Sequence, residues 1–193
     1  MKKLILAALV TIVGVLPAIS QSNYKISSAK NMIKGTSSLH DWQCVVEKQG
    51  GDASINTDGT FSINSLNIRM VVKSIRSVKA NGSYYETSMD KNTYKALNAD
   101  KYPEIVYTLS SVSNVKTSGN KATMTATGNL TIAGKTNKIS FPVTATINGN
   151  TVNFSGATKF NMSLFGIKPP TALMGTIKTG DAVTIVINTT YSK

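Results

Sequence analysis

The strongest pattern of hydrophobic and polar positions in the chain runs through residues 122–147. Apolar and polar residues alternate from 122 to 132, stop at the Gly-containing segment 133–135, and alternate again from 139 to 147. The apolar side of this pattern consists of Ala122, Met124, Ala126, Leu130, Ile132, Ile139, Phe141, Val143, Ala145 and Ile147. A period of two with β-branched residues is typical of half-buried antiparallel strands. The short connection between the two strands predicts a β-hairpin.

The same alternation, over shorter distances, predicts strands elsewhere in the chain. They cover residues 24–34, 39–46, 53–56, 61–75, 104–112, 152–160 and 182–191. Three of these stretches carry apolar pairs on one face: Trp42 with Cys44, Met70 with Val72, and Tyr107 with Leu109. The composition does not change along the chain and no internal repeat interrupts it. The sequence therefore predicts one all-β domain, an antiparallel β-barrel of about eight strands.

One short helix is expected at residues 88–98. Thr87 and Asp90 have the spacing of a capping box at its start, and Pro103 prevents its continuation. Met89, Thr93 and Ala96 lie on one side at helical spacing. We expect that side to pack on the sheet, so that the helix covers one end of the barrel or a gap in it.

Residues 164–180 form a loop that is unusually apolar. Leu164, Phe165, Leu173 and Met174 all lie in it, and the Pro169–Pro170 pair stiffens its middle. Two interpretations are open. The loop folds back into the core, or it forms the rim of an apolar cavity, since loops at barrel mouths commonly carry binding residues.

The N-terminal segment has the pattern of a secretory signal peptide. Lys2 and Lys3 precede an uncharged apolar run at residues 4–16, and small residues at 18 and 20 mark a cleavage site. We therefore expect residues 1–20 to be removed and residues 21–193 to form the mature domain, in the periplasm or outside the cell. A signal anchor is the alternative.

The charge balance is basic, with 21 Lys and Arg against 9 Asp and Glu and a formal net charge of +12. Only Arg69 and Arg76 are arginines, and the lysines are scattered. A nucleic-acid-binding protein more often clusters arginine with aromatic residues, so we expect no nucleic-acid partner. The charge either solvates the surface or attracts an anionic membrane surface or a phosphate-bearing ligand.

The residues that could carry catalysis are few. His40 and Cys44 are the sole residues of their types, but four residues along a strand span about 13 Å, too far for a nucleophile and its base. One His and one Cys also cannot supply the ligands of a zinc site. We therefore expect no enzyme activity, no metal and no cofactor.

A barrel of this size either fills with side chains or encloses an apolar ligand. Small inward residues such as Ala122, Ala126 and Ala145 leave room inside, which favours a binding protein. We expect Ala126→Phe or Ala145→Phe to block the ligand. The alternative is a structural or interaction protein with a filled core that acts through its basic surface.

Several segments, in order, resemble the YceI-like polyisoprenoid-binding family. The most specific is residues 128–136, GNLTIAGKT, with the strand at 139–143. The likeness continues in residues 34–42, 99–105, 159–161, 165–167 and 180–185. This resemblance implies a lipocalin-like barrel around an elongated apolar tunnel, in periplasmic proteins that bind polyisoprenoid chains.

On this basis we expect the chain to hold a long isoprenoid or a similar long-chain apolar lipid. The side chains expected to line its cavity are Trp42, Met70, Val72, Tyr107, Leu109, Met124, Phe141 and Phe165.

Overall fold

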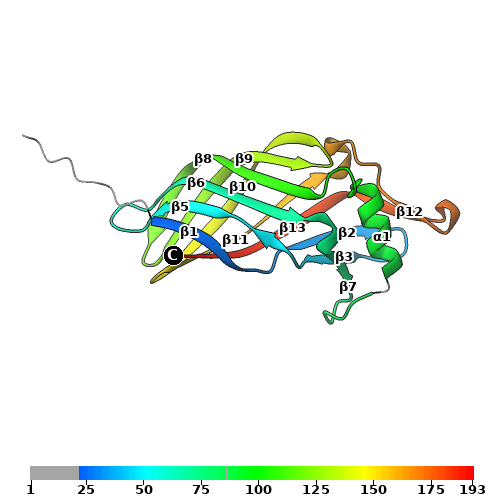
Figure 1. Cartoon of the computed structure of the whole chain (residues 1–193), viewed down its shortest axis with the longest axis horizontal. Helices are drawn as coiled ribbons and strands as arrows, with labels where there is room; N and C mark the ends of the chain where they lie inside the picture. The colour runs from blue at the N-terminus through cyan, green and yellow to red at the C-terminus, as the bar shows by residue number, and fades with distance from the viewer. Residues whose placement is uncertain (1–21, 86) are drawn as a thin grey trace, which may run out of the picture.

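Eight antiparallel strands form a closed barrel in the computed structural model, which describes residues 22–85 and 87–193 (Figure 1). The predicted signal peptide lies outside these residues. In ring order the strands are β1 (Ser22–Ala29), β5 (Asp52–Asn56), β6 (Ser62–Val71), β8 (Glu104–Ser118), β9 (Lys121–Ile132), β10 (Lys135–Asn148), β11 (Thr151–Asn161) and β13 (Ile177–Ser192). The predicted all-β barrel with one short helix is confirmed.

The first strand, β1, and the last strand, β13, close the ring. β1 pairs with β5 through Tyr24 and Ala53, and on its other edge it pairs with β13 through Lys25 and Ser192. The long meander from β8 to β11 supplies the opposite wall. Every strand of the ring is therefore paired on both of its edges over at least part of its length. This pairing removes the usual site of edge-to-edge aggregation.

The central hairpin has the expected register. β9 and β10 pair continuously from Lys121 opposite Thr146 to Ile132 opposite Lys135, with Ala126 opposite Phe141. Ala133 and Gly134 form the turn with φ of 49° and 78°, which suits a two-residue hairpin loop that needs positive φ at both positions. The apolar side of the alternation faces the interior.

A short branch of the sheet continues from β13 and departs from the predicted strands. It consists of β2 (Met32–Ser37), β3 (Trp42–Val46) and β7 (Ile75–Val78), and the small β4 (Gln49–Gly50) pairs with β6. The single strand predicted at residues 24–34 is thus two strands. The break falls at Asn31, which is buried and whose side-chain oxygen accepts hydrogen bonds from Asn188 N and Thr189 Oγ1 at 2.8 and 3.0 Å.

The long strand predicted at residues 61–75 is also interrupted. It ends at Val71, and a 3₁₀ turn, η1 (Val72–Ser74), redirects the chain into β7. Val72 N donates to Pro103 O at 2.8 Å, and Ser74 Oγ donates to Val71 O at 2.7 Å. These bonds replace ladder pairing, so the period of two cannot be extended through Val72.

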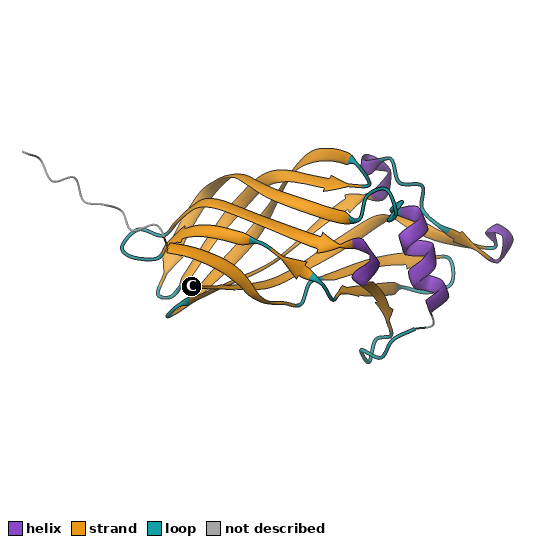
Figure 2. Cartoon of the chain, in the orientation of Figure 1, coloured by secondary structure: helices purple, strands orange, loops and turns teal. Residues whose placement is uncertain are grey.

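The helix α1 (Thr87–Ala96) lies across one end of the barrel (Figure 2). Its buried Asp90 accepts hydrogen bonds from Arg76 Nε at 2.6 Å and Ser77 N at 2.7 Å. This carboxylate ties the helix to β7, a role that the capping-box pattern did not predict. In the described part of the chain, no helix has the length and apolar character needed to cross a membrane.

The apolar loop at residues 164–180 combines the two predicted alternatives, because one part folds into the core and the other lies at the rim of the barrel. Its first part, η2 (Met162–Phe165), folds inward, and Phe165 and Ile167 are buried. The second part forms a hairpin in which β12 (Thr171–Ala172) pairs with the start of β13. The tip of this hairpin is η3 (Leu173–Gly175), and the hairpin projects at the same end as α1 (Figure 1).

Candidate functional site

The barrel encloses a cavity of about 440 Å³ between its inner strand faces. Ligand pockets for small organic molecules commonly measure about 300–1,000 Å³. The cavity reaches the surface at the end covered by α1, where its lining includes the exposed Leu39, Asn92 and Thr171. The site is thus an internal chamber with its mouth between α1 and the β12–β13 hairpin.

The walls are apolar because each barrel strand turns one side of its alternation inward. The wall residues of β6, β8, β9 and β10 are Ile63, Leu66, Ile68, Met70, Ile105, Tyr107, Leu109, Met124, Ala126, Leu130, Ile132, Ile139, Phe141 and Val143. Polar residues such as Thr125 and Thr127 face the other way and are partly exposed. The arrangement can bury a long hydrocarbon and offers it little to hydrogen-bond with.

The mouth is built by α1 and by β3. Met89, Ala96 and Leu97 of the helical segment line the chamber, as Trp42 and Cys44 do from β3. The Trp42 ring packs against Gly35, where a Cβ atom would overlap it, and Trp42 Nε1 donates to Thr36 O at 2.9 Å. Trp42 is therefore held in place at the entrance.

The opposite end of the barrel is solid. Tyr24, Ile55, Ala122, Ala145 and Val152 are completely buried there and do not line the cavity. The filled core that the sequence left open as an alternative describes this end alone. At the α1 end, the barrel is hollow.

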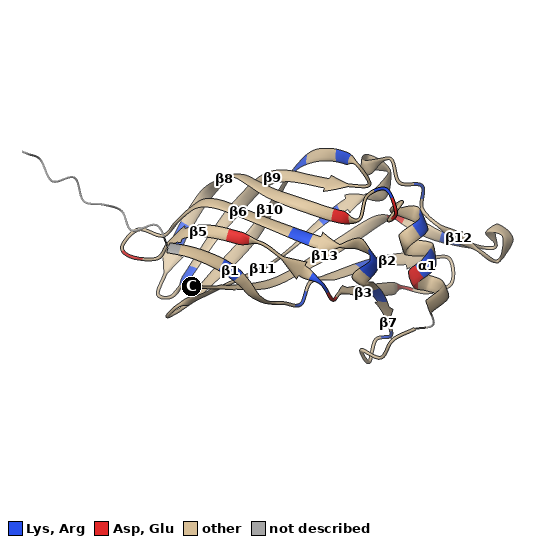
Figure 3. Cartoon of the chain, viewed as in Figure 1, with Lys and Arg blue, Asp and Glu red and all other residues tan. Residues whose placement is uncertain are grey.

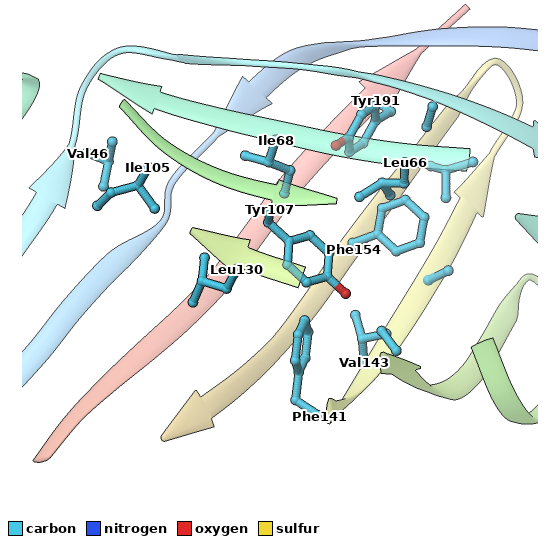
Figure 4. Close-up of a cluster of buried hydrophobic side chains, with 14 of the residues drawn as sticks. Val46, Leu66, Ile68, Ile105, Tyr107, Leu130, Phe141, Val143, Phe154 and Tyr191 are labelled. Atoms are coloured by element: carbon cyan, nitrogen blue, oxygen red, sulfur yellow. The ribbon is translucent and has the colours of Figure 1, made fainter. Parts of the chain in front are cut away.

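Aromatic side chains from four strands line the chamber, and they belong to the cluster of buried side chains in Figure 4. The rings of Tyr107 and Phe141 lie 5.8 Å apart at 54°, and Phe154 meets Tyr191 edge-on at 5.8 Å. Tyr107 fits because residue 128 is glycine: a Cβ there would lie 2.6 Å from its ring. Gly128 thus makes the room that this ring needs inside the barrel.

The two buried tyrosines of this cluster differ in their hydroxyl groups. Tyr191 Oη donates to Asn67 O at 2.9 Å, whereas the Tyr107 hydroxyl has no hydrogen-bond partner among the described residues. Burial raises the pKa of Tyr107 to about 12 and raises that of Tyr191 as well. Both phenols are therefore neutral at physiological pH.

Of the eight residues expected to line a cavity, the structure brings six together around it. They are Trp42, Met70, Tyr107, Leu109, Met124 and Phe141. Val72 and Phe165 are buried but do not line it. Val72 belongs to η1 beyond the end of β6, and Phe165 lies behind the wall, where its ring packs 5.1 Å from that of Phe160.

His40 and Cys44 both contribute to the lining but have separate partners. His40 Nδ1 lies 2.6 Å from Asp41 O in the turn before β3, and Cys44 Sγ lies 3.6 Å from Ser77 Oγ. Burial raises the pKa of the Cys44 thiol to about 11, so it is protonated at neutral pH. Across residues 22–85 and 87–193, no three His, Cys, Asp or Glu side chains form a group that could hold a metal ion.

The sequence did not identify the polar residues of the lining. Asn31 and Thr189 reach the chamber and bond to each other, and Asn31 Nδ2 also donates to Gln49 Oε1 at 2.8 Å. The one sequence signal was the interruption of alternation between β1 and β2. The hydrogen-bonding groups of these side chains are thus paired within the protein, and the bond between Asn31 and Thr189 joins the chain between β1 and β2 to β13.

A comparison with protein families identifies the fold. Residues 20–191 match the YceI-like domain, which is most of the chain. The chain belongs to the YceI-like family. The resemblance found in the hairpin and its neighbouring segments is thereby confirmed.

Solved structures agree with this YceI-like fold. BcnA of Burkholderia cenocepacia has 20% identity and a TM-score of 0.64, over 83% of this chain and 95% of BcnA. A polyisoprenoid binding domain from Saccharophagus degradans has 7% identity and a TM-score of 0.66, over 90% of this chain and 99% of the domain. The Campylobacter jejuni YCEI protein has 17% identity and a TM-score of 0.53, over 100% and 99%. No curated protein sequence matched the chain.

Proposed function

We propose that this YceI-like protein is an exported binding protein that holds one long-chain apolar lipid, an isoprenoid or a similar molecule, in the barrel chamber. The observation that carries the proposal is the apolar cavity of about 440 Å³ with a mouth at one end. Burial of a hydrocarbon contributes about 25 cal/mol per Å² of apolar surface. A snug apolar chamber therefore provides affinity without any specific polar contact.

The relatives support the isoprenoid class. The Saccharophagus degradans domain is described as polyisoprenoid binding, and a chamber with Met, Leu and Ile walls suits a flexible prenyl chain. The basic N-terminal segment with its apolar run supports export. In this proposal the mature chain acts in the periplasm or outside the cell.

The binding role is proposed to be non-catalytic. Cys44, the one candidate nucleophile, is buried against Ser77 and has a pKa of about 11, whereas reactive thiols have lowered pKa values. His40 contacts a backbone carbonyl in an exposed turn. Neither residue is activated by the other, and lipid binding requires neither.

Native mass spectrometry of the mature protein, purified from the compartment where it accumulates, tests the proposal directly. We expect an added mass that organic extraction releases and identifies as an isoprenoid or fatty lipid. A protein that purifies without added mass, and that takes up neither a polyprenol nor an isoprenoid quinone when these are supplied, would overturn the proposal.

A further inference from the structure

The end of the barrel that carries the mouth also carries the most exposed apolar side chains of the described residues. Met174 is fully exposed and Leu173 is 72% exposed, both at the tip of the β12–β13 hairpin, and Leu39 is 66% exposed. Exposure of such side chains to water costs free energy, which contact with an apolar partner would recover. Their clustering at one end therefore marks an interaction surface.

These side chains are connected to the cavity wall and to one another. Ala172 and Ile177, the paired residues just below the tip, line the chamber, and so does Leu39. Ser38 N donates to Lys178 O at 2.9 Å, and Lys178 N donates to Ser38 Oγ at 3.0 Å. The turn with Leu39 is therefore fixed beside the hairpin, and an apolar path runs from the tip into the chamber.

The backbone of the tip holds the apolar residues outward at some cost. Leu173 and Met174 have φ of 47° and 54°, a left-handed conformation that Asn and Gly adopt far more readily. Large apolar residues at both positions are not explained by the turn itself, because the hairpin needs no side chain there.

The charge of this segment identifies the partner. Between residues 164 and 180 the chain has two basic residues, Lys168 and Lys178, and no Asp or Glu. The next acidic residue, Asp181, accepts a hydrogen bond from Ser163 N at the base of the segment. Both lysines are exposed, and basic residues mark the hairpin in Figure 3. An apolar tip flanked by lysines is complementary to a bilayer with anionic headgroups: the tip enters the acyl boundary while the lysines stay at the phosphates.

We infer that the β12–β13 hairpin docks the mouth of the barrel onto an anionic lipid bilayer. Leu173 and Met174 insert, Lys168 and Lys178 bind headgroups, and Leu39 contacts the same surface. The inference rests on the proposed function, because a docked mouth lets an apolar lipid pass between bilayer and chamber without crossing water.

Vesicle co-sedimentation tests the inference with matched variants. The probes are vesicles of phosphatidylcholine with phosphatidylglycerol, and of phosphatidylcholine alone. We expect the native protein to bind the anionic vesicles. The L173D/M174D variant is expected to bind them at least about tenfold more weakly. Val115 is 41% exposed on β8 near the opposite end, and V115D is expected to bind as the native protein does.

The lysines are tested by charge reversal at low and high salt. Each of K168E and K178E is expected to weaken binding to anionic vesicles by about fivefold or more, because a lysine near the surface contributes roughly that factor. K116E and K121E, at the far end of the barrel, are the matched controls and should change binding little. Binding should weaken as salt is raised.

The lipid content of the same proteins distinguishes membrane docking by the hairpin from lipid binding in the chamber. Loss of vesicle binding in L173D/M174D with the retained lipid unchanged would support docking through the hairpin. Vesicle binding that is equal in L173D/M174D and V115D would overturn docking and leave the lipid chamber unaffected. An empty chamber in a native protein whose vesicle binding depends on the tip would support docking and overturn the proposed function.

Discussion

Arg76 on β7 and Asp90 on α1 form an ion pair in which Arg76 Nε lies 2.6 Å from Asp90 Oδ2. Asp90 is 3% exposed, and its other oxygen accepts from Ser77 N at 2.7 Å. The helix at the mouth is therefore attached to the sheet by one buried carboxylate with two donors on neighbouring residues. Removal of that carboxylate leaves both donors without their partner.

Asp90→Ala is expected to lower the free energy of unfolding by about 1–3 kcal/mol, since it leaves the buried Ser77 N–H without its acceptor and removes the partner of Arg76. Urea unfolding of the purified variant measures the change. Glu104→Ala is the matched control, because the Arg69–Glu104 pair at 3.3 Å is exposed at both side chains. Its expected cost is below about 1 kcal/mol. Equal costs for the two variants would contradict the role of Asp90.

Two alanines on paired barrel strands distinguish the hollow end from the solid end. Ala126 lines the chamber, whereas Ala145 is completely buried away from it. Ala126→Phe is expected to fill the chamber and to abolish lipid retention while the protein stays folded. Ala145→Phe, which the sequence also nominated as a blocking change, is instead expected to cost about 1–3 kcal/mol through overpacking. Native mass spectrometry and thermal unfolding of both variants check this; loss of lipid in the Ala145 variant alone would reverse the assignment.

Tyr107→Phe and Tyr191→Phe are expected to change the free energy of unfolding differently at neutral pH. The Tyr107 hydroxyl is buried without a partner among the described residues, so its removal should leave stability unchanged or raise it by about 1 kcal/mol. Tyr191→Phe loses the hydrogen bond to Asn67 O and should cost about 1 kcal/mol. Urea titrations of both at pH 7 give the comparison, and equal losses would show that the Tyr107 hydroxyl has a partner in solution.

Tyr107 also predicts a loss of stability in alkali. Its pKa is raised from 10.0 to about 12 by burial, so between these values the unfolded chain releases a proton that the folded chain keeps. The stability that the neutral, buried Tyr107 contributes is therefore fully present below pH 10, and the free energy of unfolding falls as pH rises from 10 to 12. Tyr107→Phe should show a smaller fall between pH 8 and pH 11. The same slope in both proteins would exclude this contribution.

The Cys44 thiol is expected to be inert in the native protein. Its pKa is raised from 9.0 to about 11, which lowers its thiolate fraction at pH 8 by roughly 100-fold. Alkylation with iodoacetamide at pH 8 should be slow in buffer and should become fast in urea. Native alkylation at the rate of the unfolded chain would indicate a thiol that is accessible and ionised.

Local alternation was enough to predict the chamber wall on the central strands. In β9 and β10 every second side chain faces inward, and Met124 and Phe141 line the cavity as expected. The period of two fixes the face once one face is buried. The prediction failed for Val72 because the strand ends one residue earlier, at Val71, through a bond to Pro103 O that lies far away in sequence.

Pairing between distant strands could not be predicted from local patterns. The ring is closed by Lys25 opposite Ser192 and by Asn31 bonding to Asn188 and Thr189. Such contacts depend on where the whole sheet has curved, and no short stretch of sequence encodes that. The exposure of Leu173 and Met174 could not be predicted for a similar reason, since the sequence pattern of an apolar loop is the same whether the loop is buried or exposed.

The division of the barrel into a solid end and a hollow end separates two requirements on the sequence. Tyr24, Ile55 and Val152 belong to the buried core that holds the ring together, and they do not line the chamber. Substitutions at inward positions near the mouth can therefore reshape the chamber without loosening the part that folds it. The architecture therefore permits evolutionary change in the size and shape of the chamber. It also allows the inward residues at the hollow end to be redesigned while the buried core at the solid end is kept.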